Sequence, residues 1–383
     1  MKVMIACGGT GGHLFPGLAV AERLSQRGHP VRLLVSGKAV DQMALAGFCR
    51  GVEPLGISIG SISAVGYGTS RQLINFCCRL ARATKASCGE CGRFRPDVVL
   101  GMGGFTSAPA VLAARWRRIP VAIHESNAIP GKANHWAGKL ADCVMVGWAE
   151  CARYFGRTPV AVTGTPVRAA LCRGKVANAS EQLGLERGRL TVAVMGGSQG
   201  AHAINEAVVA VLPRLKDLAR NRVSGVQFVH LAGAQDEGAV RAAYETNGFK
   251  ANVMRFCNEM ELVYSAADVV VARAGAATLT EIAAFGLPAV LVPYPQAANN
   301  HQWHNARAFE RAGAARVVEQ GNATGGAPFC ERIADALMVL LGNDAARAQM
   351  ATAAKSLAIT DAAERVMAIL EKHEGWRTPK RMN

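Results

Sequence analysis

Short apolar runs alternating with amphipathic segments dominate this chain of 383 residues. The alternation predicts βα repeats, and therefore parallel sheets whose strands are joined by helices. The same opening occurs twice, at residues 2–27 and 190–218: an apolar run, a glycine-rich turn and a helical pattern. We therefore expect an α/β protein with two Rossmann-like open parallel-sheet domains in tandem, for which the chain is long enough.

The pattern places the elements and the domain boundaries. Strands are expected at residues 31–35, 97–100, 121–124, 143–146, 160–163, 190–195, 227–231, 252–256, 269–272 and 289–292. Helices are expected at residues 71–86, 106–117, 132–139, 201–218, 302–311 and 361–370. The domains are expected at residues 1–165 and 169–357, with a helix in 358–374 returning to the first domain. A helix that carries Glu281 should end at Gly286, ahead of Pro288.

The formal net charge of +15 predicts anionic partners, namely phosphates, nucleic acid or an acidic membrane surface. The charge is dispersed, and no RNA-recognition, helix-turn-helix or zinc-finger pattern occurs, so we expect no nucleic-acid partner. No apolar run reaches the length of a spanning helix, and a glycine loop interrupts the N-terminal apolar stretch, so neither a membrane span nor a signal peptide is expected.

The 11 cysteines are scattered and odd in number, which fits a reducing cytosol better than a disulfide framework. One pair, Cys88 and Cys91, has CxxC spacing. It is expected in a polar loop, with no second pair to complete a zinc site. We interpret it as incidental.

The first glycine-rich turn is Gly8-Gly9-Thr10-Gly11-Gly12-His13. Glycines allow a tight turn and close approach to a ligand, and the free amides of the following helix favour negative charge. His13 places a group that titrates near neutral pH at this turn, where it could act as a general base or simply cap the helix. The dinucleotide-binding fingerprint is not matched, because Leu14 stands where its last glycine is required.

Further loops follow other strands and should share one edge of a sheet with His13. They are 101–105 and 124–127. The Gly and Pro of residues 164–168, followed by a polar stretch to about Arg189, predict a linker after the first domain. In the second half, the turns at 196–200 and at Gly275 each lead into a helix, and two helix N-termini suit a diphosphate. Glu281 has the position to accept hydrogen bonds from a ribose diol, or to compensate charge early in its helix.

The sequence predicts chemistry without a metal or cofactor. No Asp-x-Asp occurs, so a metal-bridged diphosphate is not expected, and neither a Walker A sequence nor a serine-hydrolase elbow is present. The charge of a leaving diphosphate would then be neutralised by backbone amides, helix dipoles and Arg168.

Six motifs occur in an order that resembles the MurG family, the bacterial UDP-N-acetylglucosamine transferases of peptidoglycan synthesis. They are Gly8-Gly9-Thr10-Gly11-Gly12-His13, Gly101-Met102-Gly103-Gly104-Phe105, His124-Glu125-Ser126-Asn127, Gly164-Thr165-Pro166-Val167-Arg168, Gly196-Gly197-Ser198-Gln199-Gly200 and the run from Arg273 to Glu281. The resemblance extends from Lys2 to about Leu370. It implies a GT-B fold, with two domains facing across a cleft. It also implies an inverting transfer of N-acetylglucosamine from UDP to the 4-hydroxyl of the N-acetylmuramoyl unit of lipid I, which gives lipid II.

The resemblance also implies roles for residues. His13 would be the base or would orient the acceptor, Glu281 would bind the ribose, and the backbone at Cys257 would contact uracil. The residues implied for UDP-N-acetylglucosamine are Thr10, Gly11, Gly12, Asn127, Arg168, Ser198, Cys257, Ala276, Ala277, Thr278, Leu279, Thr280, Glu281, His301 and Gln302. Those implied for the acceptor and phosphate loops are Gly103, Gly104 and Glu125. The chain departs from the family pattern at Ser126, where glutamine is expected, and at Asn299-Asn300, where acidic residues are commoner.

A lipid acceptor implies a peripheral protein at the cytoplasmic face of the bacterial inner membrane, with other cell-wall synthesis and division proteins as possible partners. Residues 71–82 combine apolar and basic side chains, and Trp116 lies among Arg115, Arg117 and Arg118. Such a surface suits an anionic leaflet. The same pattern fits a core helix with solvated arginines.

Two other functions remain open on the sequence. One is another GT-B transferase or a UDP-sugar 2-epimerase, although the epimerase would need an acid–base pair beside the sugar, and the expected cleft offers only Glu125 and Glu281. The other is a non-catalytic nucleotide-sugar or anion-binding protein, which would not need His13. Turnover with a lipid acceptor separates these alternatives.

Overall fold

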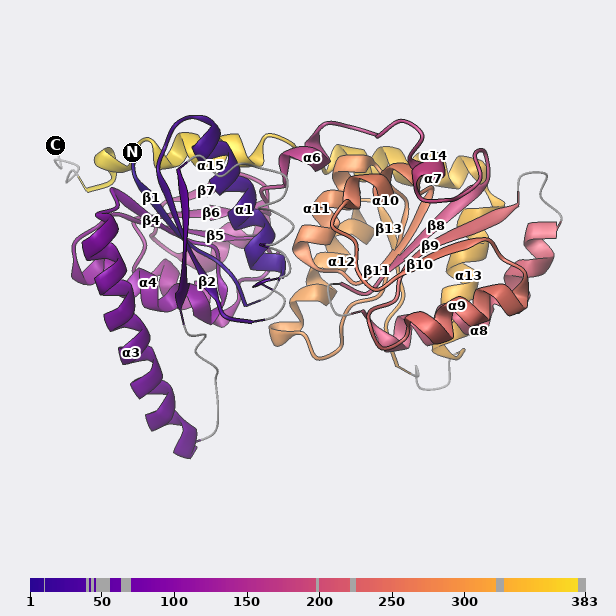
Figure 1. The fold of residues 1–383 in the computed structure, drawn as a ribbon, viewed down its shortest axis with the longest axis horizontal. Helices are drawn as coiled ribbons and strands as arrows, with labels where there is room; N and C mark the ends of the chain where they lie inside the picture. The colour runs from indigo at the N-terminus through magenta and orange to yellow at the C-terminus, as the bar shows by residue number, and fades with distance from the viewer. Residues whose placement is uncertain are drawn as a thin grey trace. The chain divides into compact units, whose positions relative to one another are not determined.

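Two compact units make up the computed structural model, which describes residues 1–9, 11–38, 41–42, 45, 56–62, 70–197, 200–220, 225–321 and 327–377. One unit joins Met1–Ala169 to Ile359–Asn383, and the other is Ala170–Ala358. Each unit is built on one parallel sheet flanked by helices (Figure 1), so the predicted α/β class with two open parallel sheets is confirmed. Thr10 and Ser198 lie outside the described residues.

The first sheet has seven strands in the order β3-β2-β1-β4-β5-β6-β7, and all neighbours are parallel. Its strands are β1 (Val3–Ala6), β2 (Val31–Ser36), β3 (Ile57–Ile62), β4 (Val98–Gly101), β5 (Val121–Glu125), β6 (Cys143–Val146) and β7 (Val160–Val162). The helices of this unit are α1 (Gly11–Gln26), α3 (Ser70–Phe94), α4 (Gly104–Trp116), α5 (Lys132–Gly138), η1 (Ala149–Phe155), α15 (Ala362–Leu370) and η3 (His373–Arg377).

Burial explains why the first strand is a continuous apolar run. All four residues of β1 are buried, as in a parallel sheet that is covered on both faces. Side chains alternate along a strand. Accordingly, Val3 and Ile5 belong to one hydrophobic core, and Met4 and Ala6 belong to a second core.

Helix α15 completes the first of these cores, although it comes from the end of the chain. Val366 and Leu370 lie in the same cluster as Val3. Glu364 forms an ion pair with Arg23 of α1 at 3.3 Å. The chain therefore returns to its first unit after passing through the second.

The second sheet has six parallel strands in the order β10-β9-β8-β11-β12-β13. Its strands are β8 (Leu190–Met195), β9 (Val226–Leu231), β10 (Ala251–Met254), β11 (Val269–Ala272), β12 (Ala289–Leu291) and β13 (Ala315–Val317). The short helices α6 (Ala169–Cys172) and α7 (Ala179–Gln182) precede it. Its other helices are α8 (His202–Arg220), α9 (Glu237–Asn247), α10 (Met260–Ala266), α11 (Ala276–Phe285), η2 (Ala298–Asn300), α12 (His301–Arg311), α13 (Phe329–Gly342) and α14 (Asp344–Ser356).

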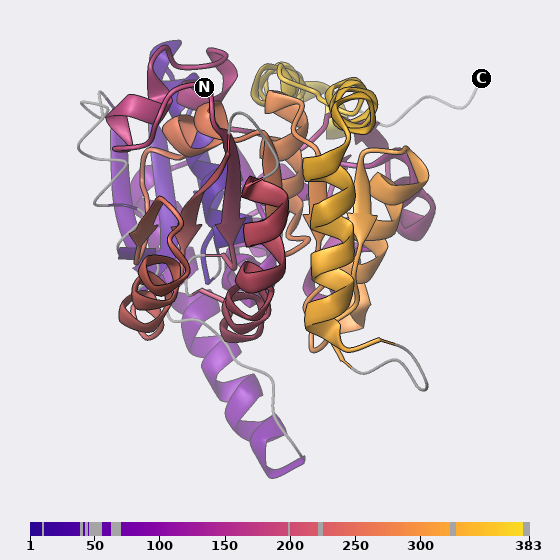
Figure 2. The same ribbon diagram turned by 90° about the vertical axis from the view of Figure 1, so that its right-hand side faces the viewer.

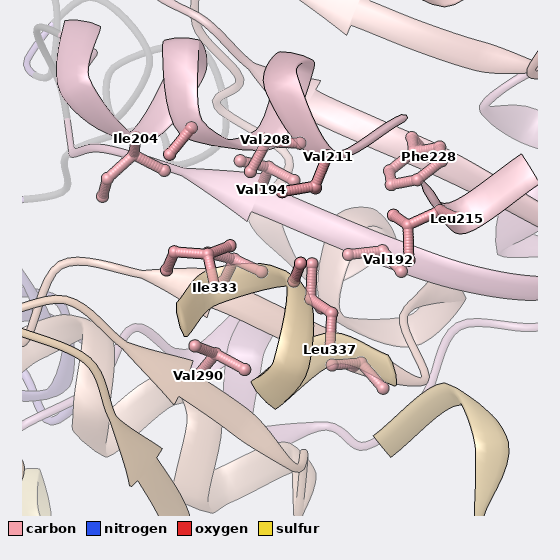
Figure 3. Close-up of a cluster of buried hydrophobic side chains, with 14 of the residues drawn as sticks. Val192, Val194, Ile204, Val208, Val211, Leu215, Phe228, Val290, Ile333 and Leu337 are labelled. Atoms are coloured by element: carbon pink, nitrogen blue, oxygen red, sulfur yellow. The ribbon is translucent and has the colours of Figure 1, made fainter. Parts of the chain in front are cut away.

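The core of the second unit joins its first strand to two long helices. Val194 of β8 clusters with Ile204 and Val208 of α8 and with Ile333 and Leu337 of α13 (Figure 3). These side chains are buried. Helix α11 ends as predicted, because Gly286 at its C-cap has a φ of 61°, a conformation that glycine adopts without strain.

The CxxC pair lies in a helix, so the prediction of a polar loop was wrong. Helix α3 continues past the predicted end to Phe94, and it contains both Cys88 and Cys91. The polar character of this stretch suggested a loop, but Cys91 is buried in the second of the two cores, so this part of the helix packs on the sheet. Burial raises the pKa of Cys91 to about 11, so its thiol stays protonated at neutral pH.

The sequence pattern also missed some elements. Neither β3 nor β13 was predicted, and both are edge strands. The polar stretch up to Arg189, predicted as a linker, contains α6 and α7. No helix in the described ranges is long and apolar enough to cross a bilayer.

Candidate active site

In each sheet, the strand order reverses beside its first strand. The reversal lies between β1 and β4 in the first unit and between β8 and β11 in the second. In open α/β sheets, ligands bind outside the carboxyl ends of the strands at such a point. The predicted glycine turns follow these four strands, so the topology brings them to the reversal points.

His13 lies in the first turn of α1 and is half-buried. Its Nδ1 is 3.0 Å from the carbonyl oxygen of Met102, which follows β4. A carbonyl oxygen only accepts hydrogen bonds, so Nδ1 is the protonated nitrogen in this contact, and in the neutral ring the lone pair is on Nε2. The contact therefore sets the tautomer that a general base at Nε2 requires.

The second glycine turn packs directly against this imidazole. Gly103 and Gly104 have φ values of 104° and 70°, which side chains other than glycine rarely adopt. A Cβ on Gly103 would lie 2.7 Å from Nδ1 of His13 and 2.9 Å from Nδ2 of Asn134. The structure thus brings the predicted residues His13, Gly103 and Gly104 together, and it adds Asn134, which the sequence did not single out.

Glu125 organises the loop after β5. It is 1% exposed, and one of its oxygens accepts hydrogen bonds from the backbone N (2.9 Å) and the side-chain Nδ2 (2.8 Å) of Asn127. The other oxygen accepts from the backbone N of Gly131 at 3.1 Å and from Nδ2 of Asn134 at 3.0 Å. These four donors satisfy the buried carboxylate, as a buried charge requires. Through two of them, Glu125 holds Asn127 in place.

His124 and Ser126 flank this carboxylate. The Nε2 of His124 donates to the carbonyl of Gly164 at 2.9 Å, and the Ser126 hydroxyl lies 3.4 Å from its Nδ1. Burial lowers the pKa of His124, so this ring is neutral at physiological pH. Ser126, one of the departures from the family pattern, is 2% exposed and contacts His124.

Arg168 lies near the start of α1. The carbon of its guanidinium group is 5.3 Å from the centre of the Phe15 ring, a cation–π contact. A Cβ on Gly11 would lie 3.1 Å from the same ring. Two predicted donor-binding residues, Gly11 and Arg168, therefore both lie against Phe15.

The glycine turn of the second unit is packed as closely as that of the first. Gly200 has a φ of 78°, and a Cβ there would collide with the carbonyl of Ala232 after β9. A Cβ on Gly196 would collide with Ala201. Both positions require glycine, and the turn leads into α8.

Helix α11 begins at Ala276, shortly after β11, which is the neighbour of β8 in the sheet. It contains the predicted segment from Ala276 to Glu281. Its first turn has no acidic residue, so its orphan amides keep their attraction for an anion. Glu281 lies further along the helix and is half-buried. The hydroxyl of Tyr264, a side chain that is 1% exposed, donates to Oε2 of Glu281 at 2.8 Å.

The predicted sugar-binding residues start α12. The Nδ1 of His301 donates to the carbonyl of Ala298 at 2.7 Å, and Oε1 of Gln302 accepts from the backbone N of Tyr294 at 2.9 Å. Asn299 and Asn300 have φ values of 53° and 51°. Asparagine tolerates this left-handed conformation.

Arg273, at the end of β11, holds the loop that leads to these residues. Its Nη1 donates to the carbonyls of Val292 (3.3 Å) and Pro293 (3.2 Å), and its Nη2 donates to Gln320 at 2.7 Å.

Cys257, whose backbone is predicted to contact uracil, follows β10 and is half-buried. No group of three His, Cys, Asp or Glu side chains is gathered for a metal ion in the part of the chain that the structure describes.

Sequence reasoning missed Asp41, Asn134 and Tyr264. Asp41 binds the backbone amide of Gly9, Asn134 binds Glu125, and Tyr264 binds Glu281. Each joins elements that are distant in the chain, and no local spacing marks such a pair. Only the packing of α5, α10 and the segment after β2 makes them visible.

This fold and these loops define a two-domain GT-B enzyme of the class that uses nucleotide sugars. The glycosyltransferase family 28 N-terminal domain matches residues 3–146, and the family 28 C-terminal domain matches residues 191–366. The chain belongs to the MurG family of N-acetylglucosamine transferases, which confirms the resemblance found in the sequence.

One relative is the UDP-N-acetylglucosamine--N-acetylmuramyl-(pentapeptide) pyrophosphoryl-undecaprenol N-acetylglucosamine transferase of Syntrophotalea carbinolica. It is 38% identical over 381 residues, which cover 96% of this chain and 98% of the relative. The crystal structure of Acinetobacter baumannii MurG matches with a TM-score of 0.71 at 29% identity, covering 97% of this chain and 99% of that chain. The UDP-GlcNAc 2-epimerase of Neisseria meningitidis, bound to UDP-GlcNAc, has a TM-score of 0.68 at 15% identity and covers 97% of this chain and 100% of its own; this likeness shows the fold alone.

Proposed function

We propose that this chain transfers N-acetylglucosamine, with inversion, from UDP-N-acetylglucosamine to the 4-hydroxyl of the N-acetylmuramoyl unit of undecaprenyl-pyrophosphoryl-N-acetylmuramoyl-pentapeptide, lipid I. The product is lipid II, the precursor of peptidoglycan. Family membership supports this reaction. The single observation that carries the mechanism is the hydrogen bond from Nδ1 of His13 to Met102 at the reversal point of the first sheet.

His13 acts as the general base. With Nδ1 donating to a carbonyl, the lone pair of Nε2 accepts the proton of the 4-hydroxyl as its oxygen attacks the anomeric carbon. The bond from that carbon to the UDP oxygen breaks in the same displacement, so the configuration inverts. Gly103 and Gly104 hold the ring without a side chain between them, and Glu125 keeps the neighbouring acceptor loop ordered.

The donor is bound by backbone amides and a few side chains. Glu281, held by Tyr264, accepts hydrogen bonds from the ribose diol, and the N-terminus of α11 neutralises charge on the leaving UDP. Arg168 supplies a further cation. The other donor-binding residues that we propose are Thr10, Gly11, Gly12, Asn127, Ser198, the Cys257 backbone, Ala276, Ala277, Thr278, Leu279, Thr280, His301 and Gln302.

Helix α3 supports a peripheral location at an anionic membrane, the cytoplasmic face of the bacterial inner membrane. Its N-terminal part extends beyond the rest of the first unit (Figure 1, Figure 2). Arg79, Arg82 and Lys85 are exposed on this helix, and Glu90 is its first acidic residue. Each cation near an anionic surface contributes about 1 kcal/mol.

Trp116, at the end of α4, is 85% exposed. It adjoins Arg117, which lies against Gly92 near the far end of α3. The side chains of residues 71–74 are outside the described residues. The membrane-binding surface that we propose is therefore the exposed basic face at Arg79, Arg82 and Lys85, rather than one patch that also includes Trp116.

Vesicle co-sedimentation tests this surface. Replacing Arg79, Arg82 and Lys85 by Ala should abolish most binding to phosphatidylglycerol vesicles at low salt and leave the weak binding to phosphatidylcholine unchanged. A control that removes the same charge from exposed positions of the second unit should retain binding; it replaces Arg187, Lys250 and Arg311. Equal losses in both variants would mean that net charge alone drives the association.

Transfer of labelled N-acetylglucosamine from its UDP conjugate to a lipid I analogue, with and without chelator, tests the reaction. We expect labelled product in both cases, with inverted anomeric configuration. His13→Ala should lower turnover by about 10²–10⁴-fold and leave UDP binding nearly intact, whereas the exposed His135→Ala should behave as the wild type. Free epimerised sugar without lipid product would indicate an epimerase, and UDP-sugar binding without turnover would indicate a binding protein.

A further inference from the structure

Asp41, in the segment after β2, is a fully buried carboxylate that the proposed mechanism does not use. It accepts hydrogen bonds from the backbone N of Gly9 (2.9 Å to Oδ2 and 3.2 Å to Oδ1) and from the backbone N of Ser36 (3.2 Å). The Ser36 hydroxyl also donates to Oδ2. All of these partners are neutral groups that belong to the ends of β1 and β2.

Among the residues that the structure describes, the donors to this buried carboxylate are neutral, so hydrogen bonds rather than a paired cation stabilise its charge. Helix α1 begins at Gly11, two residues after the amide that Asp41 binds, and it has no acidic residue in its first turn. A carboxylate at this place compensates the positive end of the helix. Asp41 thus binds the Gly9 amide just ahead of the helix.

The first glycine turn, whose Gly9 amide Asp41 binds, is packed between Asp41 and the residues around His13. Gly8 has a φ of 127°, and a Cβ there would lie 2.6 Å from Oδ2 of Asp41. On the other side, the carbonyl of Gly8 lies 3.7 Å from the place of a Cβ on Gly104, which would itself lie 3.2 Å from Cδ2 of His13. A shift of the turn would therefore be passed to Gly104, which lies against the ring.

We propose that Asp41 is a positioning residue for His13: by binding the Gly9 amide, it fixes the first glycine turn and the start of α1. The inference rests on the proposed role of His13. It assigns Gly8 and Gly9 to the alignment of the base and leaves the donor contacts proposed for Thr10, Gly11 and Gly12 as they are.

A double-mutant cycle tests this inference. In Asp41→Asn, one of the two oxygens becomes a donor that faces other donors, so the clamp loosens while the shape is kept. We expect turnover to fall about 10- to 100-fold, with the KM values of donor and acceptor within about twofold of the wild type. In the His13→Ala background the same change should cost less than about threefold, because effects on one functional unit are not additive.

Asp142→Asn is the matched control. Asp142 also accepts a backbone amide, that of Val121 at 2.8 Å, but at the amino end of β5. Its effect on turnover should be small and equal in both backgrounds. If circular dichroism shows that Asp41→Asn does not fold, Ser36→Ala, which removes one donor, replaces it in the cycle.

The outcomes separate the two proposals. If His13→Ala is impaired but the Asp41 effect is equally large in both backgrounds, Asp41 does not act through His13 and this inference is overturned while the base remains. A raised KM with unchanged turnover would also overturn it. If His13→Ala keeps wild-type turnover, the proposed function of the base fails first, and this inference fails with it.

Discussion

The contact between Tyr264 and Glu281 allows a sharp test of donor binding. Tyr264→Phe removes one hydroxyl that is 2.8 Å from a carboxylate oxygen and keeps the ring against Phe285, at 5.4 Å between centroids. A hydrogen bond to a charged group contributes about 1.5–3 kcal/mol. Because Glu281 is half-buried and water can replace the hydroxyl, we expect a loss of unfolding free energy near 1.5 kcal/mol.

The effect of Tyr264→Phe on donor affinity follows from the conformational freedom that the Glu281 side chain gains when it loses this hydrogen bond. When the donor binds, the freed Glu281 side chain must be immobilised again, which costs about 0.5–1.5 kcal/mol. A difference of about 1.4 kcal/mol is a tenfold change in affinity. The KM for UDP-N-acetylglucosamine should therefore rise about two- to tenfold, with the KM for the lipid acceptor unchanged. Steady-state kinetics at saturating co-substrate and urea unfolding measure the two effects.

Tyr244→Phe is the matched control in the same unit. Tyr244 is also 1% exposed, and its hydroxyl is 2.9 Å from Nδ1 of His230, a buried ring. Its loss should destabilise the protein by about 1–3 kcal/mol without changing the donor KM. If the two variants raise the donor KM equally, or if Tyr264→Phe leaves it unchanged, Tyr264 does not position a ribose-binding carboxylate.

Three further predictions follow from the structure. Glu281→Ala should weaken donor binding, measured by calorimetry, far more than acceptor binding; unchanged donor affinity would contradict the ribose assignment. Gly103→Ala places a Cβ 2.7 Å from His13 at a φ of 104°, a strain of about 1–3 kcal/mol, so turnover should fall at least tenfold while UDP binding persists; normal turnover would show that the ring tolerates displacement. Burial lowers the pKa of His230 to about 3, whereas the unfolded ring protonates below about pH 6.5, so the unfolded state binds the extra proton between these values and stability falls as the pH drops. Between pH 7 and pH 5, the unfolding free energy of the wild type should thus decrease by about 2 kcal/mol more than that of His230→Gln. Urea unfolding at the two pH values measures this difference, and an equal decrease in both proteins would contradict a neutral buried ring.

Much of the fold could be predicted from local pattern. The strands at 143–146, 190–195 and 269–272 have the predicted bounds, because a continuous apolar run bounded by glycine or polar turns leaves a buried parallel strand as the consistent choice. The pattern failed where packing overrides composition. The polar stretch around Cys88 and Cys91 suggested a loop, yet it is part of α3, and Cys91 is buried in the core of the first unit.

The candidate site divides in the same way. The sequence by itself determined the two α/β halves, the glycine-rich turns, and the set of loops at strand ends that resembles the MurG family. It also singled out His13 and Glu281, since their types and places in a strand–turn–helix pattern are local facts.

Only the tertiary structure decided how these residues are held. The tautomer of His13 depends on a carbonyl in a turn 89 residues away, the Gly9 amide is occupied by Asp41 from 32 residues away, and Glu281 is oriented by Tyr264 from another helix. Hydrogen bonds of this kind join groups that strand order and helix packing bring within 3 Å or so of each other. No spacing along the chain encodes them, because they exist only once the sheets and their helices have formed.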